Sequence, residues 1–171
     1  MPVLMTSSVC LSEMETLRLI ETLQEMEPLY QQLLSMLQNE KRLIIEAKTD
    51  QLVRCAREKE VVLTRLAQLE EERIAATRRL FPQNPSLTLK TLIPLVVPVY
   101  RKKLESLHHS LDVLTASITE LNQMNGILIE RVLAQISDLF ALLRHLTPAG
   151  EIYEPTGEMR RVSSGRIIGR G

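Results

Sequence analysis

The chain has 171 residues, of which 44% are hydrophobic and 25% are charged, and its formal net charge at pH 7 is zero. This balance excludes a wholly disordered chain and is typical of a globular protein with one domain of ordinary size. A neutral chain has no overall attraction to nucleic acid or to an anionic membrane surface, and its copies do not repel one another.

A long helix with a proline in its middle is predicted for the N-terminal part of the chain. Residues 1–10 are expected to form a flexible arm, and the helix is predicted over about 12–47. Apolar residues recur at helical spacing on both sides of Pro28. Because proline removes a backbone donor and crowds the preceding turn, we expect a kink or a restart of the helix there.

A second helix is predicted over about 50–80, with Thr49 or Asp50 as its N-cap. Its apolar stripe carries two charged residues, Lys59 and Arg73. We expect their stems to lie on the seam, with their charged ends in water or paired with glutamates of the first helix. The alternative is a functional role, in which they hold the helix register or a carboxylate of a bound protein.

A proline-rich break separates these two helices from the last one. Two prolines within residues 81–86 end the second helix, and a short helix is predicted over about 87–93. Pro94 and Pro98 are then expected to bend the chain before the last helix, which is predicted over about 96–147.

The last helix carries a continuous apolar stripe, whose members recur at steps of three and four residues from Leu104 to Leu146. So long a stripe needs partner helices from its own chain, from a second copy or from another protein. Asn125 interrupts the stripe, and a buried Asn lowers stability but fixes register or partner number. Gly126 lowers helix propensity by about 1 kcal/mol relative to Ala. Together they indicate close approach of another helix, or a softened site that changes shape on binding.

Residues 148–171 are predicted to form a flexible, disordered tail, because glycine and arginine are frequent there and apolar periodicity is lost. The tail carries one compact apolar group, Ile152-Tyr153, followed by Pro155 and Gly157. Such a tyrosine-anchored turn is typical of a short docking motif. The alternative is an inert tail.

The sequence offers little for catalysis or for a cofactor. Cys10 and Cys55 are too few for a metal cluster, and we interpret them as reduced thiols. Glu105 and His108 have the Glu-x-x-His spacing of bundle metal sites, but no second copy of that motif exists. There is no phosphate-binding glycine loop and no nucleophile elbow. We therefore expect no enzyme, no metal and no cofactor.

The patterns together predict an all-α protein. We expect an elongated antiparallel bundle or coiled coil of about three long helices, with a helical domain over 11–147 and the tail after it. No apolar run is long enough to span a bilayer, and the first residues lack the features of a signal peptide. A cytoplasmic location is therefore expected.

The segment from Leu121 to Glu130, read as LNQMNGILIE, resembles the L-N-x-x-N-x-x-L-I pattern of the FlgN family of flagellar type III export chaperones. The tail segment from Tyr153 to Gly157 is similar to that family's Tyr-x-x-x-Gly motif, which precedes a basic end rich in Gly and Ser. The order of elements also fits the family. The departures from it are Pro28, the pair Pro94 and Pro98, and a longer tail.

The resemblance implies a chaperone of flagellum assembly that holds the C-terminal segments of the hook–filament junction proteins FlgK and FlgL. It would prevent their premature assembly and deliver them to the export gate protein FlhA. The resemblance places Tyr153, and with it Gly157, in docking to the gate. It also implies a client-binding site on the last helix at Asn122, Asn125, Gly126 and Leu128. The predicted site also includes the neighbouring residues Leu121 and Val132.

Two other hypotheses stay open. The chain can be a structural coiled coil or adaptor that associates with itself, as a homo-oligomer, and holds no secreted client. It can also be a membrane or nucleic-acid adaptor that uses the tail arginines, although glutamates beside them weaken this patch. Client binding and self-association make different predictions for the stripe of the last helix, and a binding assay separates them.

Overall fold

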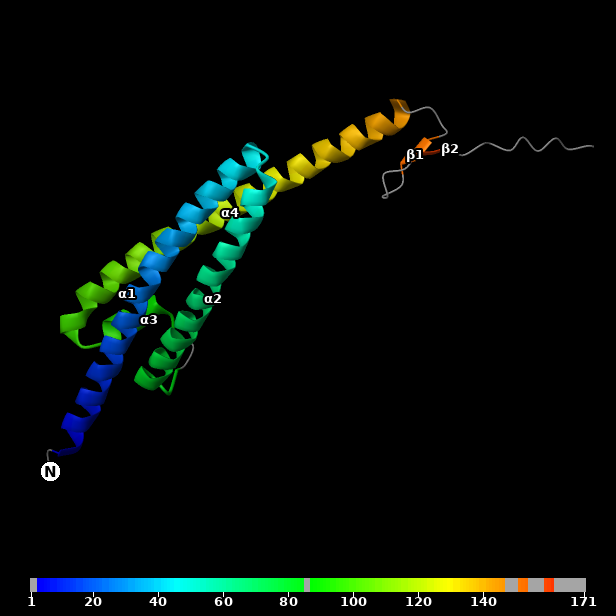
Figure 1. Cartoon of the computed structure of the whole chain (residues 1–171). Coiled ribbons are helices and arrows are strands. Elements are labelled where there is room, and N and C mark those ends of the chain that lie inside the picture. The colour runs from blue at the N-terminus through cyan, green and yellow to red at the C-terminus, as the bar shows by residue number, and fades with distance from the viewer. Residues whose placement is uncertain (1–2, 85–86, 147–150, 154–158, 162–171) are drawn as a thin grey trace, which may run out of the picture. The chain divides into compact units, whose positions relative to one another are not determined.

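The computed structural model describes residues 3–84, 87–146, 151–153 and 159–161 (Figure 1). The predicted all-α class is confirmed, with long helices packed together. The helices are α1 (Val3–Ile45), α2 (Thr49–Leu80), α3 (Leu89–Leu92), the 3-10 helix η1 (Ile93–Leu95) and α4 (Pro98–Leu146). The chain divides into two compact units, Met1–Leu128 and Ile129–Gly171.

The first unit is built around an antiparallel pair, α1 and α2, on which the first part of α4 packs (Figure 1). Its core is almost entirely aliphatic, because the chain has so few aromatic residues. The largest apolar side chains that are essentially removed from water come from all these elements: Leu19, Leu23, Leu37, Leu43, Leu69, Leu92 and Leu104. Burial of each such leucine stabilises the fold by about 2 kcal/mol.

The helix α1 differs from the prediction at its start and at its proline. It begins at Val3, within the stretch predicted as a flexible arm, and it continues through Pro28 without a restart. Pro28 and Gln24, whose carbonyl loses its helical donor, both lie on the exposed side of α1. Water can therefore satisfy that carbonyl, while buried neighbours such as Met26 and Leu33 hold the helix on both sides of the proline.

The turn between α1 and α2 is closed by two backbone hydrogen bonds, from Ala47 N to Ile44 O at 3.2 Å and from Lys48 N to Leu43 O at 3.0 Å. This pair of bonds is the Schellman arrangement, which places Ala47 in the left-handed region at φ 52°. The predicted N-cap of α2 was wrong, because the helix begins at Thr49 and its capping residue, Lys48, makes no side-chain cap.

Replacing Ala47 by Gly is expected to raise the free energy of unfolding by about 0.5–1 kcal/mol. Glycine avoids the steric cost of the left-handed conformation, and this gain exceeds the extra entropy of the unfolded glycine. Urea titration followed by circular dichroism measures the change. Ala56→Gly, at an exposed position inside α2, is the control and should lose about 1 kcal/mol. A loss of stability in Ala47→Gly would contradict the role assigned to this turn.

The prolines before α4 occupy positions that tolerate them. Pro94 lies in the first turn of η1, and Pro98 is the first residue of α4. At both positions the missing N–H has no helical partner to lose. The short helix predicted over 87–93 is α3 followed by η1, and Thr88 caps α3 by accepting a hydrogen bond from Thr91 N.

The second unit contains the remainder of α4 and two short strands, β1 (Glu151–Tyr153) and β2 (Met159–Arg161). The strands pair antiparallel, with Ile152 opposite Arg160. The sequence did not predict this pairing, because three-residue strands leave no measurable alternation. The rest of the predicted tail lies outside the described residues.

Candidate functional site

The apolar stripe of α4 changes its surroundings along the helix. Leu104, Leu107 and Leu111 are buried in the core of the first unit, and Ile118 and Leu121 pack against it. Asn125 is the last buried residue of α4. The prediction that the stripe needs partner helices is therefore confirmed for its first part, which packs against α1 and α2.

Asn125 joins α4 to α1 by its side-chain amide. The residue is 2% exposed. Its Nδ2 donates to the backbone oxygen of Leu37 at 2.9 Å and to Glu40 Oε2 at 3.0 Å. Its Oδ1 is buried without a hydrogen-bond partner. Because a buried amide with fixed partners is costly to displace, Asn125 sets the register of α4 against α1, as expected for a polar residue in a helical seam.

Glu40 extends this network to α2. Its Oε1 accepts a hydrogen bond from Lys59 Nζ at 2.6 Å, and both side chains are mostly removed from water. The predicted pairing of Lys59 with a glutamate of the first helix is thus confirmed. Arg73 does not pair with the first helix, and instead donates to both carboxylate oxygens of Glu70 in its own helix at 2.7 Å.

Cys55 lies next to the same network. Its thiol donates to the backbone oxygen of Met36 at 3.7 Å, and the residue is buried and not in a disulfide. Burial, followed by the nearby carboxylate of Glu40, raises the pKa of this thiol above its ordinary value. A buried thiol with a raised pKa is a poor nucleophile, so Cys55 is part of the packing.

A groove of about 400 Å³ opens where α1, α2 and α4 meet. Its walls are mostly apolar, and Lys59 and Asn122 supply polar atoms at its edge. The lining residues are Leu33, Leu37, Lys59, Leu63, Ile118, Thr119, Asn122 and Gln123. The groove therefore lies beside the polar network and uses one of the residues predicted for client binding.

The predicted site residues are not gathered into one surface. Leu121 is half-buried against the core, Asn122 is exposed in the groove and Asn125 is buried. Gly126 has no neighbouring atom within 4 Å of the place where a Cβ would lie, so the predicted close approach of another helix there is wrong. Leu128 is half-buried in the first unit.

The other predicted residues fall in the second unit. Val132 is half-buried there. Tyr153 is the last residue of β1, and Gly157 lies outside the described residues.

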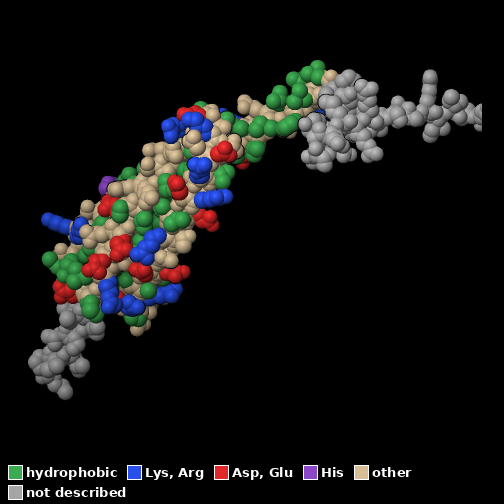
Figure 2. Space-filling view, in the orientation of Figure 1, with side chains coloured by type: hydrophobic (Ala, Val, Ile, Leu, Met, Phe, Trp, Pro, Cys, Tyr) green, Lys and Arg blue, Asp and Glu red, His purple; other side chains and the backbone are tan. Residues whose placement is uncertain are grey.

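The second unit exposes an apolar surface on α4, which we call the distal face. In Figure 2 hydrophobic side chains gather along this last part of the helix. Its residues are Ile129, Leu133, Ile136, Leu139, Phe140 and Leu146. Phe140 is 62% exposed and Leu146 70% exposed. Some of these residues belong to the predicted stripe, but the sequence carries no signal that separates its exposed part from its buried part.

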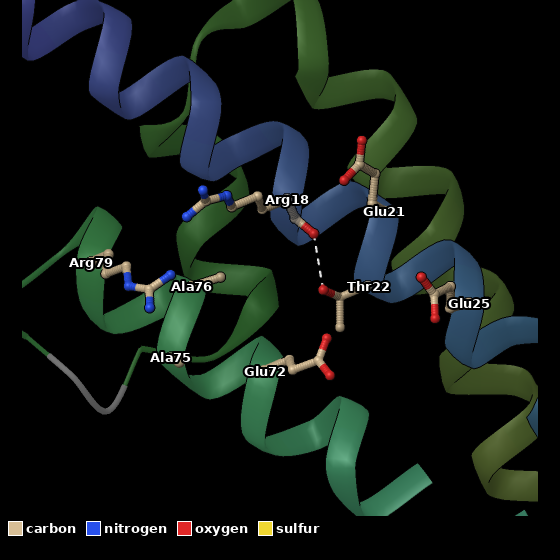
Figure 3. A pocket seen from close by; sticks show the side chains of 8 residues that line it. All are labelled: Arg18, Glu21, Thr22, Glu25, Glu72, Ala75, Ala76 and Arg79. Atoms are coloured by element: carbon tan, nitrogen blue, oxygen red, sulfur yellow. Dashed lines mark hydrogen bonds between the residues drawn. The ribbon is translucent and has the colours of Figure 1, made fainter. Parts of the chain in front are cut away.

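A second, charged cleft lies between α1 and α2 and has a volume of about 310 Å³ (Figure 3). Arg18 and Arg79 lie toward one side of it, and Glu21, Glu25 and Glu72 lie toward the other. Glu15 pairs with both arginines, at 3.0 Å and 3.5 Å. Because the opposite charges neutralise one another here, the cleft has no strong preference for an anion or a cation.

Acidic and basic side chains are likewise interspersed over the visible face of the first unit (Figure 2). Among the described residues, no group of three His, Cys, Asp or Glu side chains is placed to hold a metal ion. None of the helices, over the residues the structure describes, is both long and apolar enough to cross a membrane.

The sequence model of a family described as FlgN protein matches residues 14–161. No curated protein and no solved structure matches the chain. The matched range contains the buried polar network, the groove, the distal face and both strands.

Proposed function

Because this chain belongs to the FlgN family of flagellar export chaperones, we propose that it holds the C-terminal helical segments of the junction proteins FlgK and FlgL. In this role it prevents their premature assembly and delivers them to the export gate protein FlhA. In this proposal the chain is a cytoplasmic protein that binds its client without catalysing a reaction and needs no cofactor. Family membership supports the chaperone role itself, and the identity of these clients and of the gate is the proposal.

The observation that carries the proposal is the exposed distal face. Large apolar side chains side by side on one helix face are costly in water and are a frequent mark of a protein-binding surface. An amphipathic client helix can cover such a face with apolar anchors at helical spacing. A client segment that orders only when it binds fits this mode, because the face is already helical.

The groove beside Asn122 supports a second contact for the client. It is lined by apolar side chains of three helices, and its polar atoms lie at the edge. A single apolar side chain fits its volume, whereas a whole helix does not. We propose that Leu121, Asn125, Gly126 and Leu128 lie behind or beside this contact and support the residues that touch the client. Val132 belongs to the part of α4 that binds the client.

A binding assay with the purified chain tests the proposal. Full-length FlgK and FlgL should bind, and versions that lack their C-terminal segments should not. Binding that is equal with and without those segments, or no binding to either protein, would overturn the client assignment.

The exposed distal face also favours one other function, a coiled coil that associates with itself. Light scattering with and without client separates the two functions. An oligomer whose mass stays fixed when client is added supports the structural coiled coil, whereas replacement of self-association by a client complex supports the chaperone.

Tyr153→Ala is expected to leave folding and client affinity within about twofold of the parent and to reduce binding to the export gate at least tenfold. Tyr153 lies in β1 of the second unit, after the end of α4, and an aromatic residue is a common anchor of a docking motif. Affinity for purified FlhA, measured with and without bound client, checks this. Tyr153→Phe keeps the ring and is the matched control. Loss of client binding in Tyr153→Ala would contradict the division between holding and delivery.

A further inference from the structure

We infer that one end of the first unit binds an anionic lipid surface. The residues involved come from the end of α2, from α3 and η1, and from the start of α4, and all of them are exposed. We call them the basic end: Arg78, Lys90, Leu95, Val99, Lys102 and Lys103. None of them belongs to the groove or to the distal face, so the inference goes beyond the proposed client binding and does not depend on it.

The neutrality of the whole chain conceals an uneven distribution of charge. Between Glu72 and Glu105 there is no acidic residue, yet this stretch holds seven of the 21 basic residues of the chain. These seven are Arg73, Arg78, Arg79, Lys90, Arg101, Lys102 and Lys103. A chain of zero net charge therefore contains one long segment that is strongly basic.

The fold brings the two ends of this segment to the same end of the first unit (Figure 1). The Arg79 guanidinium, near the end of α2, lies 3.5 Å from Glu15 Oε2. The Tyr100 hydroxyl, in the first turn of α4, donates to Glu13 Oε1 at 2.7 Å. Both helices therefore meet the same turn of α1, and between them α3 buries Leu92 in the shared core.

The acidic residues of α1 at this end do not neutralise it. Glu15 is already paired with two arginines, Arg18 and Arg79, and Glu13 accepts the hydrogen bond from Tyr100. Four exposed basic residues have no acidic partner among the residues that the structure describes: Arg78, Lys90, Lys102 and Lys103. Positive charge at this end therefore exceeds negative charge and faces water.

The two ends of the chain supply no counter-charge. Residues 1–12 contain no acidic or basic residue, and residues 151–171 carry four arginines against three glutamates. Neither segment is complementary to the basic end in charge, and a second copy of the chain presents the same basic end. The complementary negative charge therefore comes from a different molecule.

Two exposed apolar side chains distinguish a lipid surface from other anionic partners. Leu95 is 57% exposed and Val99 is 72% exposed, and they lie in the same segment as the lysines. The phosphate backbone of a nucleic acid attracts the bases but gives these two side chains no apolar surface. An anionic bilayer offers both contacts, because its headgroups attract lysine and arginine while apolar side chains enter the boundary beneath them.

The origin of the basic residues also favours a lipid surface over an acidic helix. They come from three elements that meet at one end of the unit, and not from successive turns of one helix face. An acidic helix contacts a narrow stripe of its partner. A membrane surface is broad and reaches side chains from all three elements at once.

Sedimentation of the full chain with lipid vesicles tests the role of charge. The vesicles contain phosphatidylcholine and phosphatidylglycerol in equal parts, and vesicles of phosphatidylcholine alone are the control. Lys102→Gln/Lys103→Gln should weaken binding to the anionic vesicles roughly 25-fold, because each base near such a surface contributes roughly fivefold. Arg54→Gln/Arg57→Gln removes two exposed charges near the start of α2 and should bind within twofold of the parent.

A second pair of variants tests the apolar contact in the same assay. Val99→Ser should weaken binding to the anionic vesicles about tenfold, because the valine side chain is no longer transferred from water. Val61→Ser is the matched control, since Val61 is 71% exposed within α2, and it should bind as the parent does. Circular dichroism verifies that every variant folds.

Three results would overturn the inference. The first is equal binding of the parent to neutral and anionic vesicles, or no binding to either. The second is a lysine variant that binds as tightly as the arginine control. The third is binding of polyglutamate without binding of vesicles, which would assign the basic end to an acidic protein. None of these results bears on the binding of FlgK and FlgL, so the proposed function is tested separately.

Discussion

Phe140→Asp is expected to weaken client binding by about a hundredfold while leaving the thermal unfolding of the chain unchanged. Phe140 is 62% exposed, so it contributes little to the fold of the free protein. In the complex its ring would be buried, and a buried aromatic side chain contributes about 2–3 kcal/mol. The introduced carboxylate also has to be desolvated against an apolar partner surface, which adds to the loss.

Isothermal titration with the client segment measures this effect, and circular dichroism measures the unfolding. Val61→Asp is the matched control, because Val61 is 71% exposed on α2, away from the distal face in the sequence. It should bind client as the parent does. If Phe140→Asp binds within twofold of the parent, the distal face is not the client site.

Glu40→Leu is expected to lower the free energy of unfolding by about 2–3 kcal/mol. Glu40 is the only residue in the described network that contacts both other helices, through Lys59 and Asn125. Its removal leaves the ammonium group of Lys59 without its partner in a site that is largely closed to water. Some of the cost is avoided because the long lysine side chain can reach toward solvent.

The double variant Glu40→Leu/Lys59→Met separates charge from packing. Because apolar side chains of similar size replace the ion pair, it should recover most of the lost stability. Glu25→Leu, which breaks the exposed Arg65–Glu25 pair, is the control and should change stability by less than about 0.5 kcal/mol. Urea unfolding measures the free energy of unfolding of Glu40→Leu, of the double variant and of the control. A stability for Glu40→Leu equal to that of the parent would show that the network does not stabilise the three-helix contact.

The polar network also explains where the buried part of α4 ends. The described ladder of buried leucines ends near Leu111, and the helix is then held by half-buried residues and by Asn125. A polar residue with fixed partners has one favourable position, whereas leucines can pack in several registers. Asn125 therefore fixes where the covered part of α4 stops, and with it which residues remain exposed for a client.

The sequence alone determined the all-α class, the three long helices and the family resemblance. Periodicity of apolar residues and the scarcity of aromatics are local properties, and they persist whatever the helices pack against. It also identified Asn125 as a departure from an ideal seam, and Lys59 as a seam residue whose charged end lies in water or pairs with the first helix. Each of these predictions depended on residue type and spacing within a single helix.

Only the tertiary structure decided which part of the stripe is covered. Leu104 and Leu139 look alike in the sequence, yet the first is buried against other helices and the second is exposed. The same limit applies to Gly126, where open space takes the place of the expected neighbouring helix. It also applies to Pro28, which lies on the exposed side of α1, where water can satisfy the backbone carbonyl that loses its hydrogen bond. Burial depends on what lies opposite a residue in space, and this is a property of the packed helices that no single helix carries in its own sequence.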